Sequence, residues 1–377
     1  MNQIIVDGKA PEKIRLFGLD HLRAVAIGLV FLYHYGRLFP HPDWTNTISI
    51  FGWTGVDLFF VLSGYLISAQ LFSKIEAQKP ISFKSFFIKR FFRIIPAYLL
   101  VVALYFMIPF CREREGLAPL WKYLSFMQNF GLDLRSQGTF SHAWSLCIEE
   151  QFYLFLPLTL MILLYFKAMK KSRVLLILLF IISFIARICT WQIKVLPFID
   201  NNDSWAYWYK WIYYPTFCRL DGLLVGVTVA AFFKFYPNIK MQLFKYVNIV
   251  FWISLLTLIL AYFICMDQET FVASIFGFPL VSVGYGLMVI YAICPKTVLF
   301  KTSSTVTTTI ATLSYSIYLT HKIIIHITQD YFSKFQVEKD SNSMFLICIV
   351  TSLLGAMLVN KLVEKPFLKL RGRFVKT

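Results

Sequence analysis

The sequence predicts an all-α, polytopic membrane protein with about ten transmembrane helices. Of its 377 residues, 58% are hydrophobic and only 15% are charged, whereas about a quarter of the residues of a soluble domain are charged. Aromatic residues reach 18%, with Phe the most numerous, which is typical of lipid-facing surfaces and interfacial belts. Apolar runs of roughly 18 to 24 residues recur along the chain, and each is long enough to cross about 30 Å of hydrocarbon. A bilayer is therefore the expected solvent.

The apolar runs predict ten spans. They fall near residues 19–39, 50–72, 91–110, 144–166, 172–192, 213–236, 247–265, 272–293, 306–328 and 343–363. The first and the sixth are the most polar. The length of the chain favours one domain over residues 1–377, with residues 1–18 and 364–377 as terminal segments.

The placement of the basic residues decides what the net charge of +17 means. With the N-terminus inside, the cytoplasmic segments hold about 24 Lys and Arg residues and the outer loops about nine. This positive-inside bias predicts an inner-membrane protein with both termini cytoplasmic, and no nucleic-acid partner. Lys9, Lys13 and Arg15 precede the first run as in a signal peptide, but no small-residue cleavage site ends that run, so we expect a retained helix. The outer loops at 111–143 and 193–212 are the best candidates for contacts with an external substrate.

Seven cysteines are scattered along the chain, without a C-x-x-C pair or metal-ligand spacing. We interpret them as packing residues and predict no metal site.

Ionisable residues inside the apolar runs are functional candidates, because a charge in a bilayer costs a few kcal/mol on insertion scales. They are Asp20, Arg23, His34, Asp57, Glu149, Glu150, Arg187, Arg219, Asp221, His321 and Lys322. Arg23 and His34 are eleven residues apart, which places them on one helix face about 16 Å apart along the axis. Helix direction predicts that the outer half holds His34 together with Asp57, Glu149, Glu150, Arg219, Asp221 and His321.

Two simpler explanations of these charges remain open. Buried pairs, Arg219 with Asp221 or His34 with Asp57, could only tie helices together. The basic stretch at 89–93 could bind phosphates through its guanidinium groups. It could equally consist of positive-inside residues whose side chains extend to the membrane interface.

Several motifs now follow one another in order. They are LDHLRA at 19–24 leading to Tyr33 and His34, GVDLFFVLSGY at 55–65, KRFFRIIP at 89–96, HAWSLCIEEQFY at 142–153, RLD at 219–221 and LSYSIYLTH at 313–321. Together they resemble the acyltransferase-3 family of membrane-bound O-acyltransferases, which modify bacterial polysaccharides, lipopolysaccharide, peptidoglycan, glycolipids and some antibiotics. The resemblance covers nearly the whole chain. His21 stands where Gly is usual in the family, and Cys147 where Ser is usual.

The resemblance implies transfer of an acyl group, expected to be acetyl from acetyl-CoA, to a hydroxyl of a cell-surface carbohydrate such as lipopolysaccharide O-antigen or an exopolysaccharide. It makes Arg23 and His34 essential, and we add Asp57, Glu149 and Glu150 as catalytic candidates. Donor-binding candidates are Arg23, Ser63, Arg90 and Arg93. Acceptor-binding candidates are His142, Ser145, Tyr153, Arg219, Asp221 and His321.

Some family members carry a C-terminal hydrolase-like domain. The sequence ends shortly after residues 364–367, so we expect delivery directly to the acceptor or through a separate protein. Membrane lipid is the other expected partner.

Two mechanisms stay open at this point. His34, oriented by Asp57 or Glu149, would act as a general base toward the acceptor hydroxyl, or it would itself be acylated and then discharged. A secondary transporter of a glycolipid or small anion is the alternative function of another class, and a structural membrane scaffold is a third.

Overall fold

The computed structural model describes residues 16–374, and within these residues the chain is helical without a β-strand. Residues 1–15 of the predicted cytoplasmic N-terminus, with Lys9, Lys13 and Arg15, lie outside the described part, as do residues 375–377. The α-helices are α1 Phe17–Leu38, α2 Trp44–Ser49, α3 Thr54–Glu76, α4 Phe83–Met107, α5 Leu120–Leu124, α6 Trp144–Tyr165, α7 Ser172–Thr190, α8 Ser204–Trp208, α9 Asp221–Phe235, α10 Pro237–Lys245, α11 Val247–Ile264, α12 Phe278–Ile293, α13 Val298–Lys301, α14 Thr305–Phe332, α15 Asn342–Val359 and α16 Lys365–Phe374.

Serine side chains mark the starts of three long helices. Ser82 accepts a hydrogen bond from the backbone N–H of Ser85 at α4, Ser304 from that of Thr307 at α14, and Ser341 from that of Met344 at α15. An N-cap oxygen satisfies an N–H that has no partner inside the first turn, which fixes where each helix begins.

Six helical segments within residues 16–374 are long and apolar enough to cross a membrane, so a multi-pass membrane protein is supported but ten spans are not confirmed. The six are Trp44–Glu76, Ser141–Tyr165, Met169–Phe198, Val247–Ile264, Ala273–Ile293 and Asn342–Phe374, and a seventh would join α9 and α10, which are bent by 105°. The predicted spans at 19–39, 91–110 and 306–328 form the long helices α1, α4 and α14, which are not among the six. Helices α1 and α14 are too polar to be counted among the six, because they carry Arg23, His34, His321 and Lys322 on inward faces.

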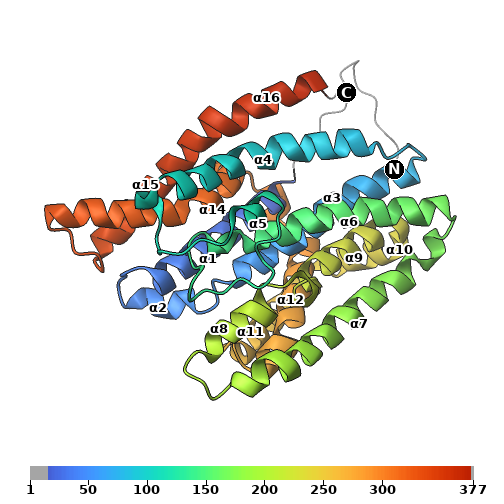
Figure 1. Ribbon diagram of the computed structural model, residues 1–377. Coiled ribbons are helices and arrows are strands. Elements are labelled where there is room, and N and C mark those ends of the chain that lie inside the picture. The colour runs from blue at the N-terminus through green and yellow to red at the C-terminus, as the bar shows by residue number, and fades with distance from the viewer. Residues whose placement is uncertain (1–15, 375–377) are drawn as a thin grey trace.

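The helix pairs pack closely where glycines remove the side chain. Helices α3 and α9 approach each other closely: a Cβ on Gly64 would lie 2.2 Å from the carbonyl oxygen of Leu223, and one on Gly226 would lie 2.3 Å from that of Val61. Small residues allow such backbone approach between membrane helices, where dispersion rather than the hydrophobic effect drives packing. Helix α14 packs against α1 and α15, and α12 against α11. In Figure 1, α4 and α16 run alongside each other at one edge, and α7 lies at the opposite edge.

Two buried ion pairs tie α3, α7 and α9 together, and they correct the pairings predicted from sequence. Arg219 donates from Nη2 to both carboxylate oxygens of Asp57, at 3.0 Å each. Arg187, fully buried on α7, forms a salt bridge with Asp221 and also donates to the carbonyl oxygen of Cys218 at 3.0 Å. Arg219 therefore does not pair with Asp221, its near neighbour in sequence, because the guanidinium turns toward α3 while Asp221 faces α7.

Breaking the second pair from one side should destabilise the fold. We expect Arg187→Met to lower the free energy of unfolding by about 3–5 kcal/mol, because it leaves the Asp221 carboxylate buried without its cation. The double variant Arg187→Met/Asp221→Leu should recover much of that loss. Thermal unfolding of the purified protein in detergent measures both, and a double variant no more stable than the single one would contradict the assignment.

Candidate active site

Two cavities meet inside the bundle. The histidine chamber, of about 580 Å³ including its open side, is lined by His34, His142 and a set of aromatic residues. The arginine chamber, of about 1150 Å³ including its open side, is lined by Arg23, Arg90 and Arg93. The two chambers have Val56 and Tyr318 in common. Arg23 and His34, predicted to share one face of α1, therefore reach two different cavities that adjoin.

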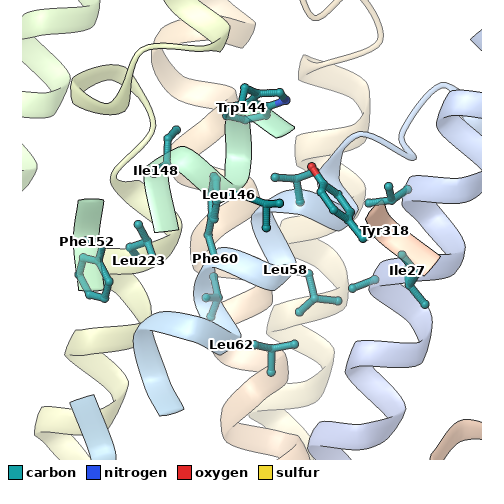
Figure 2. Packing of buried hydrophobic residues seen from close by; sticks show 14 of the residues in the cluster. Ile27, Leu58, Phe60, Leu62, Trp144, Leu146, Ile148, Phe152, Leu223 and Tyr318 are labelled. Atoms are coloured by element: carbon teal, nitrogen blue, oxygen red, sulfur yellow. The ribbon is translucent and has the colours of Figure 1, made fainter. Parts of the chain in front are cut away.

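Tyr318 is fixed at this boundary by two hydrogen bonds. Its hydroxyl donates to the carbonyl oxygen of His142 and lies 2.6 Å from Oγ of Ser145. Because the single hydroxyl proton goes to the carbonyl, Ser145 is the donor in the second bond. Figure 2 shows the Tyr318 ring among the buried apolar side chains, near Leu146, Leu58 and Ile27.

His34 is oriented by another histidine. Its Nδ1 lies 3.0 Å from Nε2 of His321 and 3.0 Å from the carbonyl oxygen of Val30, one turn earlier in α1. The expectation that Asp57 or Glu149 orients His34 is thus wrong: Asp57 is held by Arg219, and Glu149 accepts hydrogen bonds from Ser63 and Tyr153. Helix direction gives depth in the bundle but not rotation about each axis, so residues at one depth need not touch.

The hydrogen bonds assign the tautomers of both neutral rings. Nδ1 of His321 lies 3.0 Å from the carbonyl oxygen of Ile317 and 2.9 Å from that of Tyr318, so it carries the proton and donates. Nε2 of His321 is then an acceptor, and Nδ1 of His34 is the donor that faces it. This assignment leaves the lone pair of His34 on Nε2, the ring position free to take a proton or attack an acyl carbon.

His142 is the third ring of this cluster and makes no hydrogen bond through either nitrogen to any residue in 16–374. It is 2% exposed, and its ring centre lies 5.6 Å from that of His34 and 5.1 Å from that of His321. Buried polar groups are normally satisfied, so a side chain that lines a cavity with both nitrogens unpaired is available to a ligand.

Aromatic side chains form most of the remaining wall of the histidine chamber. They are Tyr33, Trp53, Trp144, Tyr209, Tyr213, Tyr214 and Tyr318. A five-residue π-helical segment, Tyr209–Tyr213, supplies two of them. The hydroxyls of Tyr33 and Tyr209 are 2.8 Å apart, and Gln268 donates to both.

The Arg219–Asp57 pair lies behind this wall rather than in it. The guanidinium carbon of Arg219 is 4.0 Å from the ring centre of Phe278 and 4.8 Å from that of Tyr213. Arg219, Asp57 and Asp221 are 2%, 3% and 4% exposed and do not line either chamber. Their contacts fit a role in holding the aromatic wall in place.

All four predicted donor-binding residues, Arg23, Ser63, Arg90 and Arg93, line the arginine chamber. Ser63 donates to Glu149 at 3.0 Å, Tyr153 donates to the other oxygen of Glu149 at 2.9 Å, and the guanidinium carbon of Arg90 lies 4.3 Å from the centre of the Tyr153 ring. Ser145 also lines this chamber, whereas Glu150 lines neither chamber.

One ion pair at the histidine chamber was missed by the sequence interpretation. Lys322 of α14 lies 2.5 Å from Oε1 of Glu113, and both side chains are at most 2% exposed. Burial raises the pKa of the Glu113 carboxyl, but the Lys322 ammonium more than offsets this and leaves that pKa below its usual value. Glu113 lies in a loop, outside the apolar runs that were searched for charges, whereas Lys322 was noted but left without a partner.

Loop residues also close the chamber. Arg114, Leu134, Ser141 and His142, all from the predicted outer loop at 111–143, and Tyr209 from the loop at 193–212 belong to its lining. No group of three His, Cys, Asp or Glu side chains suited to a metal ion occurs within residues 16–374.

Comparison with known proteins places the chain in a family. The family model described as an acyltransferase domain matches residues 16–361. O-acetyltransferase OatA of Staphylococcus aureus (strain NCTC 8325 / PS 47) is 30% identical over 373 residues, which cover 93% of this chain and 57% of OatA. A protein of Staphylococcus aureus (strain COL), provisionally named an O-acetyltransferase, is 29% identical over 375 residues with the same coverage. The chain thus spans little more than half the length of these relatives, and no solved structure matches it.

The loop that carries Leu134 should loosen in acid. Hydrogen bonds from Arg135 hold the pKa of Asp133 at about 2, below the usual value of about 3.9. Because the folded-state pKa is the lower one, this pair stabilises the loop above about pH 4, and the contribution is lost as the pH falls toward 2. Pepsin cleavage in residues 125–140, followed from pH 5 to pH 2, should therefore rise below about pH 4. Asp133→Asn should be cleaved faster already at pH 5, and equal cleavage there would contradict the prediction.

Proposed function

Since the chain belongs to the acyltransferase-3 family and is a multi-pass membrane acyltransferase, we propose that it transfers acetyl from acetyl-CoA to a hydroxyl of a carbohydrate on the outer side of the inner membrane. The observation that carries this proposal is that His34 and three arginines line two adjoining cavities with Val56 and Tyr318 in common. One cavity suits an anionic donor, and the other suits a sugar.

The arginine chamber supports the donor side. Arg23, Arg90 and Arg93 present guanidinium forks, which match the geometry of phosphate oxygens and would hold those of CoA. The basic stretch that includes Arg90 and Arg93 lies on the side that the positive-inside distribution assigns to the cytoplasm, together with both termini. The proposal therefore loads CoA from the cytoplasm, with the thioester directed toward Tyr318.

The histidine chamber supports the acceptor side. Tyr33, Tyr209 and Tyr213 combine ring faces, on which the apolar face of a sugar packs, with hydroxyls that hydrogen-bond to its polar edges. His142 adds two unpaired nitrogens beside His34. A carbohydrate hydroxyl is thus the acceptor that this lining suits best.

His34 is the proposed reacting group. With Nδ1–H directed at His321, its Nε2 lone pair removes the proton of the acceptor hydroxyl while the oxygen attacks the thioester carbonyl. The C–S bond then breaks, and the proton on Nε2 passes to the departing CoA thiolate. In the alternative order Nε2 attacks first and expels CoA thiolate to form an acyl-imidazole; attack by the acceptor hydroxyl then breaks the C–N bond, and the hydroxyl proton ends on the CoA thiol. Both routes begin from the same lone pair, and His321 is a positioning residue in each.

Loss of His34 should abolish transfer. With purified protein, radiolabelled acetyl-CoA and a mixed glycan acceptor, we expect His34→Gln to lower the transfer rate by at least roughly 10³-fold. His326→Gln, a matched change on α14 outside both chambers, should keep the wild-type rate. In sealed vesicles the same label separates the alternative function, because uptake without acetylated product would indicate a transporter. Wild-type transfer by His34→Gln would end the proposal.

His321 should act through the tautomer of His34. His321→Ala removes the acceptor that faces Nδ1 of His34, and we expect transfer to fall by roughly 10²- to 10⁴-fold with little change in KM for either substrate. His321→Gln offers an amide oxygen in place of Nε2 and should retain more activity than Ala. The measurement is kcat and KM on the same amount of folded protein, and equal loss in both variants would argue against the positioning role.

A further inference from the structure

One cation at the exposed side of the histidine chamber has no carboxylate partner within residues 16–374. Among the described residues, its lining includes two cationic side chains, Arg114 and Lys322, and no carboxylate. Lys322 is already neutralised by Glu113, which also accepts a hydrogen bond from the backbone N–H of Phe140 at 3.1 Å. Arg114, which is solvent-exposed at the mouth of the chamber, is therefore the lining cation that no carboxylate of the described residues neutralises.

The acids near the chamber are committed to other partners. Asp133, next to the lining residue Leu134, lies 2.7 Å from Arg135 and 3.4 Å from Lys210. Asp203 lies 3.1 Å from Arg135. Glu115 does not line the chamber, and Arg114 forms no salt bridge in the part of the chain that the structure describes. The local acids thus leave Arg114 unpaired.

The backbone positions Arg114 at the chamber. Thr139 donates from its hydroxyl to the carbonyl oxygen of Arg114, and the N–H of Thr139 donates to that of Gly116 at 3.0 Å. A Cβ on Gly138 would lie 2.5 Å from Cδ and 3.0 Å from Nη1 of Arg114. Glycine at 138 therefore leaves the space that the Arg114 side chain occupies.

From this charge balance we infer that the acceptor is an anionic carbohydrate, whose carboxylate or phosphate pairs with Arg114 while a hydroxyl of the same molecule faces His34. A guanidinium binds either group through two parallel hydrogen bonds. The neutral His34–His321 pair places no negative charge nearby that would repel such an acceptor. The inference rests on the proposed function for the transfer step, but the binding step stands on Arg114 alone.

Three small acceptor probes test the inference on the 377-residue chain in nanodiscs. They are methyl glucoside, which is neutral, methyl glucuronoside, which carries a carboxylate, and glucose 6-phosphate. Binding is followed by quenching of tryptophan fluorescence, since Trp53 and Trp144 line the chamber, and transfer is followed with radiolabelled acetyl-CoA. The wild type should bind at least one anionic probe roughly 10-fold or more tightly than the glucoside, and the better of the two identifies the anionic group.

Arg114→Gln should lower the ratio of the affinity for the anionic probe to that for the neutral probe by roughly 10- to 100-fold, and Arg114→Lys should restore part of this ratio. Lys334→Gln removes the same unit charge from an exposed site outside both chambers and should leave the ratio at the wild-type value. Equal binding of neutral and anionic probes by the wild type, or an unchanged ratio in Arg114→Gln, would overturn the inference. Charge-selective binding without acetyl transfer would instead reject the proposed function and leave the anionic site standing.

Discussion

Three pairs of opposite charges are buried in this helical bundle, and the need to keep each pair together constrains how the helices are arranged. Isolated charges in hydrocarbon are costly, and removing one partner of a buried pair leaves the other uncompensated. Asp57 and Arg219 join α3 to the start of α9, Arg187 and Asp221 join α7 to α9, and Lys322 holds the loop at Glu113 against α14. The first two pairs lie behind the aromatic wall and support it, whereas Lys322 of the third pair lines the histidine chamber itself.

Within this bundle, a histidine rather than a carboxylate orients the proposed reacting group. In serine hydrolases the orienting residue is an acid, which also stabilises the imidazolium that forms. Here Nε2 of His321 accepts from Nδ1 of His34, and backbone carbonyls of α14 set the His321 tautomer. A neutral partner costs less to bury than a carboxylate. It also adds no negative charge to a cavity in which Arg114 is already unpaired.

The sequence alone predicts the helical membrane class and the shared face of Arg23 and His34, because both follow from apolar length and from the 100° turn per residue. It does not predict the partners of Asp57 and Asp221, because depth in a bundle leaves the rotation of each helix undetermined. The sequence also does not predict that Glu113 and Arg114 lie at the histidine chamber. Both belong to a loop whose position against α14 depends on contacts between Thr139, Arg114 and Gly138. Hydropathy alone does not give the number of spans. Helices α1 and α14 are long but carry polar side chains on their inward faces, and these side chains lower the mean hydropathy of both helices.

Tyr318 and Val56 line both the arginine chamber and the histidine chamber, and this has a consequence for the proposed reaction. A two-carbon group is small enough to pass a boundary of single side chains, so neither CoA nor the sugar has to cross the bilayer. In that reaction an acetyl group reaches the outer face although neither of the two molecules that exchange it leaves its own side of the membrane.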